Sequence, residues 1–104
     1  MTIDKGLLFE GVQGFDWDYY NENKNIFKHN VSTAECEQIF FNLPLLINDD
    51  LAHGDEDEER YLAFGRTDEN RKLFVAFEIR NQLIRPISFR DMEKPERAIY
   101  EKYK

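Results

Sequence analysis

The chain has 104 residues, the size of one small domain. Hydrophobic residues make up 41% of it and aromatic residues 14%, which supplies enough apolar material for one core and excludes a disordered chain. The net charge of -7 at pH 7 argues against a nucleic-acid-binding protein, because such proteins usually carry a basic surface.

The charge is unevenly distributed along the chain. Residues 49–59 contain seven acidic residues and no Lys or Arg, whereas residues 60–104 contain eleven basic and seven acidic residues. The field near a binding site depends on local charge rather than on the total. The second half of the chain therefore remains compatible with an anionic ligand, although bulk attraction to RNA should be poor.

A single cysteine, Cys36, excludes an intramolecular disulfide, and a small secreted domain would normally need such cross-links. The N-terminal residues contain no apolar run of the kind found in signal peptides. No stretch approaches the roughly 20 apolar residues that a membrane span requires. We therefore expect a cytoplasmic protein that does not contact a membrane.

We expect residues 1–104 to form one domain, in which residues 1–14 are an N-terminal extension. This extension contains three apolar residues in a row and predicts a short strand or arm that ends at two glycines. The next four residues predict a second extended piece. Phe15 and Trp17 should share one of its faces, because side chains alternate along a strand.

Two helices are predicted next. The first covers residues 19–29, with Asp18 in the N-cap position and Asn30 suited to the left-handed residue that ends a helix. Ser32 and Glu35 have the spacing of a capping box, in which each side chain accepts a hydrogen bond from the other residue's backbone. This pair predicts the start of the second helix.

Leu43-Pro44 should end the second helix, because proline cannot continue it. Residues 45–48 then predict a short strand and residues 49–59 a polar loop. Three alternating segments predict an antiparallel meander: residues 60–67, 72–80 and 83–89. Pro86 lies in the last of these strands, where it cannot donate to a ladder and so requires a sheet edge or a bulge.

The last predicted element is a helix that begins near Pro95, a residue favoured in the first helical turn. We expect Ala98, Ile99 and Tyr103 to pack this helix against the rest of the protein. The element order is helices, then an antiparallel sheet of three to four strands, then one C-terminal helix. That order is typical of the α+β class.

Three blocks of residues occur in a specific order and spacing between about residues 15 and 103. They are Phe15-Asp16-Trp17-Asp18 with Asn25 and Lys28-His29-x-Val31-Ser32; Glu59-Arg60 with Gly65-Arg66; and Arg85-x-Ile87-Ser88-x-Arg90 with Glu96-Arg97 and Tyr100. Together the blocks resemble the BrnT family of bacterial toxins, which are relatives of the RelE-like ribonucleases.

The resemblance implies a RelE-like fold and a type II toxin that cleaves RNA without a metal or other cofactor and thereby inhibits translation. In this chemistry the 2′-hydroxyl of the RNA attacks phosphorus, so the enzyme needs a base, an acid and cations. The implied catalytic residues are His29, Lys28, Glu59 and Arg85. The implied RNA-binding residues are cations that match a phosphate: Arg60, Arg66 and Arg90.

The resemblance also implies a protein partner. A toxin of this kind would be neutralised by a cognate BrnA-like antitoxin with a ribbon-helix-helix domain. The toxin would then contact DNA only indirectly, through the antitoxin, when the pair represses its own operon.

Each implied site residue also has a purely structural explanation. Lys28 and His29 end a predicted helix, where positive charge suits the helix dipole. Arginines on strands are ordinarily exposed to solvent without any role in binding. Glu59 belongs to an acidic run, and such runs are usually solvated. His53 and the aspartates near it have the spacing of neither an EF-hand nor a zinc site, so we expect no metal.

Two other functions remain open. Where the family has an aliphatic and a small residue, this chain has Pro86 and Phe89. With the net charge, these residues are compatible with a catalytically inactive BrnT-like binding module that acts with an antitoxin in operon autoregulation. Alternatively, residues 49–59 mimic nucleic acid and occupy a basic groove in this chain or on a partner.

Overall fold

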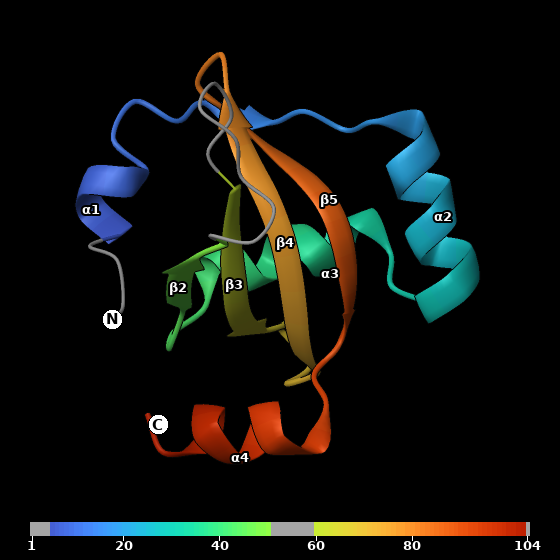
Figure 1. Cartoon of the computed structure of the whole chain (residues 1–104), viewed down its shortest axis with the longest axis vertical. Coiled ribbons are helices and arrows are strands. Elements are labelled where there is room, and N and C mark those ends of the chain that lie inside the picture. The colour runs from blue at the N-terminus through green and yellow to red at the C-terminus, as the bar shows by residue number, and fades with distance from the viewer. Residues whose placement is uncertain (1–4, 51–59, 104) are drawn as a thin grey trace.

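The computed structural model describes residues 5–50 and 60–103 of the chain. In chain order its elements are α1 (Lys5–Leu8), β1 (Gly14–Phe15), α2 (Tyr19–His29), α3 (Thr33–Gln38), the 3-10 helix η1 (Ile39–Phe41), β2 (Leu46–Asp49), β3 (Arg60–Arg66), β4 (Lys72–Arg80), β5 (Leu83–Asp91) and α4 (Lys94–Glu101) (Figure 1). The predicted α+β class is confirmed.

The sheet has one strand more than the three to four predicted. Its order is β1-β5-β4-β3-β2, and the predicted antiparallel meander forms its centre as β3, β4 and β5. The additional strand is β1, whose residues Gly14 and Phe15 pair in parallel with Leu83 and Ile84. The sheet is therefore mixed rather than purely antiparallel.

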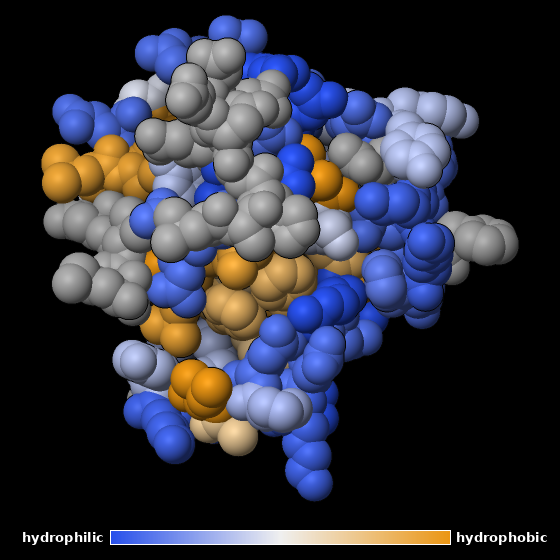
Figure 2. Space-filling view, viewed as in Figure 1, coloured by the Kyte–Doolittle hydropathy of each residue, from blue (hydrophilic) through white to orange (hydrophobic). Residues whose placement is uncertain are grey.

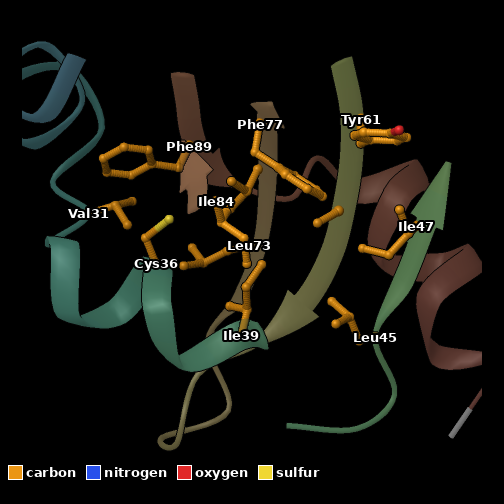
Figure 3. Close-up of a cluster of buried hydrophobic side chains, with 12 residues drawn as sticks. Val31, Cys36, Ile39, Leu45, Ile47, Tyr61, Leu73, Phe77, Ile84 and Phe89 are labelled. Carbon is orange, nitrogen blue, oxygen red and sulfur yellow. The ribbon is translucent and has the colours of Figure 1, made fainter. Parts of the chain in front are cut away.

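The core lies between the sheet and the segment formed by α3 and η1, on what we call the back face of the sheet. Alternate residues of β3 and β4 point to this face and are buried, among them Tyr61, Leu73 and Phe77 (Figure 3). Gly65 continues this series and lies directly under η1, so that a Cβ there would sit 2.9 Å from Cβ of Ile39. A larger residue at this position would therefore push η1 off the sheet.

The two predicted N-terminal helices are confirmed, as are the signals that delimit them. The backbone N–H of Tyr20 donates to Asp18 Oδ1 over 2.8 Å at the start of α2, and Asn30 ends that helix with φ 54°. At the start of α3 the Glu35 N–H donates to Ser32 Oγ over 3.1 Å, while the Ser32 N–H donates to Glu35 Oε1 over 3.0 Å. Short-range hydrogen bonds thus account for both helix starts.

Two predictions at the chain ends are wrong. Residues 5–8 of the N-terminal extension form the helical turn α1 instead of a strand, whereas residues 1–4 lie outside the described part. The C-terminal helix is packed by Tyr100, which is 1% exposed and donates to the carbonyl of Pro44. Ile99 and Tyr103 point to solvent instead.

The bulge expected near Pro86 is present. The register between β4 and β5 shifts between Ala76 and Phe77, whose partners are Ser88 and Pro86, so that Ile87 is the extra residue. No helix within residues 5–50 and 60–103 is long and apolar enough to cross a membrane.

Asn25 fastens α2 to the outer edge of β5, beyond the two residues that pair with β1. Its side-chain amide donates to the Ile87 carbonyl over 3.2 Å, and its side-chain oxygen accepts from the Phe89 N–H over 2.9 Å. Asn25 is completely buried. It therefore replaces a neighbouring strand for two backbone groups that would otherwise be buried without a partner.

We expect Asn25→Leu to lower the free energy of unfolding by about 3 kcal/mol, because it keeps the side-chain size but leaves a backbone donor and acceptor unsatisfied. The measurement is urea denaturation followed by circular dichroism. Asn23→Leu is the matched control, because Asn23 is exposed on the same helix and its side chain donates to the Tyr19 carbonyl one turn earlier in that helix. Equal losses for the two variants would contradict the role given to Asn25.

Candidate functional site

The front face of the sheet, opposite α3, carries the candidate site. Strands β3, β4 and β5 pass in front of α3 in Figure 1, so the viewer looks onto this face. Its centre is apolar, with hydrophilic side chains around it (Figure 2). Phe64 and Phe74 are register partners there, with ring centroids 5.4 Å apart.

Three charged residues form one row across the front face. Arg60 on β3 pairs with Glu78 on β4, and Glu78 pairs in turn with Arg85 on β5. Directly opposed residues on antiparallel strands have Cβ atoms about 5 Å apart and point to the same face. We call Arg60, Glu78 and Arg85 the charged row; Glu78 at its centre is only 5% exposed.

Arg85 is held in place by the start of α2. Its Nη2 donates to Asp18 Oδ2 over 2.8 Å, while the other oxygen of the same carboxylate accepts the N-cap bond of α2. Within the described residues, the Nε atoms of Arg60 and Arg85 are buried and have no hydrogen-bond acceptor. The charged row therefore holds two buried donors that an anion could satisfy.

Arg90 lies on the same face of β5 but is engaged by α4. Its guanidinium donates to both carboxylate oxygens of Glu96, over 2.8 and 3.1 Å, and lies over the ring of Phe74, with Cζ 4.2 Å from the centroid. The hydrogen bond from Arg90 holds the pKa of the Glu96 carboxyl below its ordinary value. Arg90 thus connects α4 to the sheet.

Arg66 lies at the far end of β3 from the charged row. Its Nε donates to the Leu43 carbonyl over 2.8 Å, in the connection between η1 and β2. Six residues separate Arg66 from Arg60, which corresponds to about 20 Å along a strand. The structure therefore does not bring these two predicted RNA-binding arginines together.

His29 and Lys28 lie at the end of α2 that is remote from Asp18 and Arg85. A helix of eleven residues is about 16 Å long, so His29 is far from the charged row. Lys28 is exposed. Glu59, the remaining predicted catalytic residue, lies outside the described residues and directly precedes Arg60 in the chain.

The backbone around His29 is fixed by Arg71, which precedes β4. The Arg71 guanidinium donates to the carbonyls of His29 and Asn30, to Glu35 at the start of α3 and to both oxygens of Asp91 at the end of β5. The hydrogen bonds from Arg71 hold the pKa of the Asp91 carboxyl below its ordinary value, against the effect of burial, and the charges of Arg71 and Arg97 add to this lowering. Burial alone would raise the pKa of Glu35, but bonds from Ser32 and Arg71 lower it.

Sequence reasoning missed three residues of this arrangement: Asp18 as a partner of Arg85, Arg71 and Glu78. A signal for Glu78 was present, because the alternation of residues 72–80 places it on the face opposite Leu73, Val75 and Phe77. No comparable signal existed for Arg71, which lies in a turn and whose partners lie 20 to 42 residues away in the chain.

One comparison with known proteins shows the family of this chain, and another shows a similar fold. A family model described as "Ribonuclease toxin, BrnT, of type II toxin-antitoxin system" matches residues 17–96. The chain is similar to the crystal structure of the ribonuclease toxin BrnT from Brucella abortus, with a TM-score of 0.54 and 20% sequence identity, over 79% of this chain and 99% of that one. No curated protein sequence matches.

We expect the free energy of unfolding to fall when the pH drops below about 4. Asp91 and Glu96 have lower pKa values in the folded protein than their ordinary values of 3.8 and 4.5. Their ion pairs therefore stabilise the fold above those values, and this stabilisation is lost as the pH falls through the lower folded-state values.

The measurement is urea denaturation at several pH values between 7 and 2.5. The double variant Asp91→Asn, Glu96→Gln should be less stable at pH 7 and should lose less stability on acidification than the wild-type chain. An unchanged acid dependence in this variant would show that other carboxylates govern it.

Proposed function

This chain belongs to the BrnT family of ribonuclease toxins of type II toxin–antitoxin systems, and we propose that it is itself an endoribonuclease that cleaves RNA without a metal ion. The observation that supports this proposal best is the charged row. Arg60 and Arg85 come from two different blocks of the family resemblance, yet they flank one residue on the same face of the sheet. Both have buried donors that a phosphate could satisfy.

The reaction proceeds through the RNA's own 2′-hydroxyl. Its oxygen attacks the adjacent phosphorus as its proton passes to a base, and the bond from phosphorus to the 5′-oxygen breaks as that oxygen receives a proton from an acid. The products are a 2′,3′-cyclic phosphate and a 5′-hydroxyl. In this scheme Arg60 and Arg85 bind the phosphate and stabilise the charge that develops on it.

The base in this proposal is Glu59, which directly precedes Arg60 in the chain. His29 and Lys28 are proposed to contact the same RNA at the far end of α2. Arg90 lies near that end, because its neighbour Asp91 is joined through Arg71 to the carbonyl of His29. Since α2 is about 16 Å long, the bound RNA then spans several nucleotides. Arg66 is farthest from the charged row and contributes least to the cleavage step.

Membership of a type II toxin–antitoxin family implies a protein antitoxin as partner. We propose that this antitoxin is BrnA-like, with a ribbon-helix-helix domain, and that it neutralises the toxin and carries the DNA contacts of the pair. Cleavage of RNA then inhibits translation whenever the antitoxin is depleted. The acidic residues 51–59 lie outside the described part, so their proposed mimicry of nucleic acid stays a prediction.

A second candidate is the catalytically inactive binding module. It is favoured by the hydrogen bonds that several arginines already make to acceptors within the protein. Arg85, Arg66 and Arg90 each have a protein acceptor in the structure. Pro86 and Phe89, in contrast, do not favour it, because their side chains are buried on the back face and leave the front face unchanged.

We expect induced expression of the wild-type chain without its antitoxin to arrest bacterial growth and to degrade RNA. Arg85→Ala should lower the cleavage rate by about 100-fold, because it removes a preorganised donor from the developing charge. The measurement is cleavage of purified RNA in the presence of EDTA, with analysis of the 3′ ends for cyclic phosphate. Lys102→Ala is the control, since it removes an exposed cation outside the front face.

Circular dichroism must show that each variant is folded, because Arg85 also holds Asp18. A soluble wild-type chain that neither arrests growth nor cleaves RNA would decide for the inactive module. Cleavage that EDTA abolishes would refute the metal-independent mechanism while leaving ribonuclease activity in place.

A further inference from the structure

The centre of the charged row holds an acidic residue that the proposed cleavage reaction does not use. Glu78 is 5% exposed and lies between Arg60 and Arg85, its register partners on the two neighbouring strands. We propose that Glu78 is an internal counter-ion that takes the place of an RNA phosphate between these two arginines and thereby sets how tightly the site holds RNA. This inference rests on the proposed ribonuclease function.

The charges around Glu78 alternate in sign. Arg60, Glu78 and Arg85 follow one another across the sheet, and Arg85 is bound in turn to Asp18. Like charges at directly neighbouring positions would destabilise a sheet, whereas this order places every charge next to its opposite. The four charges sum to zero, so the row exerts little long-range attraction on RNA when no RNA is bound.

Asp18 binds Arg85, and Glu78 lies beside both arginines in register, but these carboxylates leave two arginine donors without an acceptor among the described residues. In the described part of the chain, Nε of Arg60 and Nε of Arg85 are buried without an acceptor. A buried donor without an acceptor carries a desolvation penalty, which a ligand oxygen can relieve. A phosphate has more acceptor oxygens than a carboxylate, so it can supply both the counter-charge and the missing acceptors.

In this proposal, binding of RNA is an exchange, in which a phosphate takes the place of Glu78 as the negative charge beside the two guanidinium groups. Replacing Glu78 by glutamine keeps its size but removes its charge, so that an additional cation becomes available to RNA. For single strands, each phosphate that a protein neutralises contributes about -0.7 to the slope of log affinity against log salt concentration. The number of available cations can thus be read from this slope.

The experiment measures the affinity of the full chain for a single-stranded 2′-O-methyl RNA oligonucleotide, which cannot be cleaved through the 2′-hydroxyl, at several salt concentrations. We expect Glu78→Gln to bind several-fold more tightly than the wild-type chain at low salt. Its slope should be steeper by about 0.7. Glu69→Gln is the matched control, because it makes the same change in net charge at an exposed turn between β3 and β4.

Glu78→Thr is a second variant without the charge, in case glutamine prevents folding; threonine suits a half-buried strand position. If either folded variant has the affinity and slope of Glu69→Gln, or binds RNA more weakly than the wild type, the inference is wrong. If neither variant folds, Glu78 has a purely structural role and the inference is equally wrong.

The same measurements separate this inference from the proposed function. A wild-type chain that neither binds nor cleaves RNA would contradict the ribonuclease proposal itself. A wild-type chain that cleaves unmodified RNA, together with Glu78 variants that behave like Glu69→Gln, would contradict only the role of Glu78.

Discussion

A single guanidinium, that of Arg71, joins the elements on which the candidate site depends. Its planar group bridges carboxylates of α3 and β5 and also binds the last carbonyls of α2. A lysine could not do this, because its ammonium cannot bind two carboxylates and two carbonyls in a fixed plane. Arg71 sets the position of α2 at one end of β5, Asn25 sets it in the middle and Asp18 sets it at the other end. The orientation of Arg85 is consequently determined by all three contacts.

The protein has a net charge of -7, and several of its arginines are paired internally with acidic side chains. Asp18, Glu96 and Asp91 each bind an arginine through hydrogen bonds of 2.7 to 3.1 Å. These carboxylates serve the fold, because they cap helices or connect helices to strands. Two of them, Asp18 and Glu96, bind the proposed RNA-contacting residues Arg85 and Arg90. If the proposed site is correct, stability and RNA binding depend on the same two arginines.

Local signals in the sequence predicted the elements well, but they could not predict how distant elements meet. The capping box of Ser32 and Glu35 and the alternation of residues 72–80 depend on neighbours in the chain, and both appear in the structure. The strand β1 was not identified as part of the sheet, because its two residues gain that role only from pairing with residues 83 and 84. The candidate site shows the same limit: His29 and Arg85 both lie in characteristic blocks, yet their separation depends on the direction of α2 along β5.

The hydrogen bonds of Asn25 also have a consequence for association with other proteins. Unpaired edge strands accept strands from other chains, which leads either to specific complexes or to aggregation. Because the carbonyl of Ile87 and the N–H of Phe89 are already bound to Asn25, this stretch of β5 cannot extend the sheet into a partner. A protein that binds here must recognise the side chains of α2 and not the backbone of the strand behind it. The side-chain amide of Asn25 thus prevents another strand from pairing with this edge of β5.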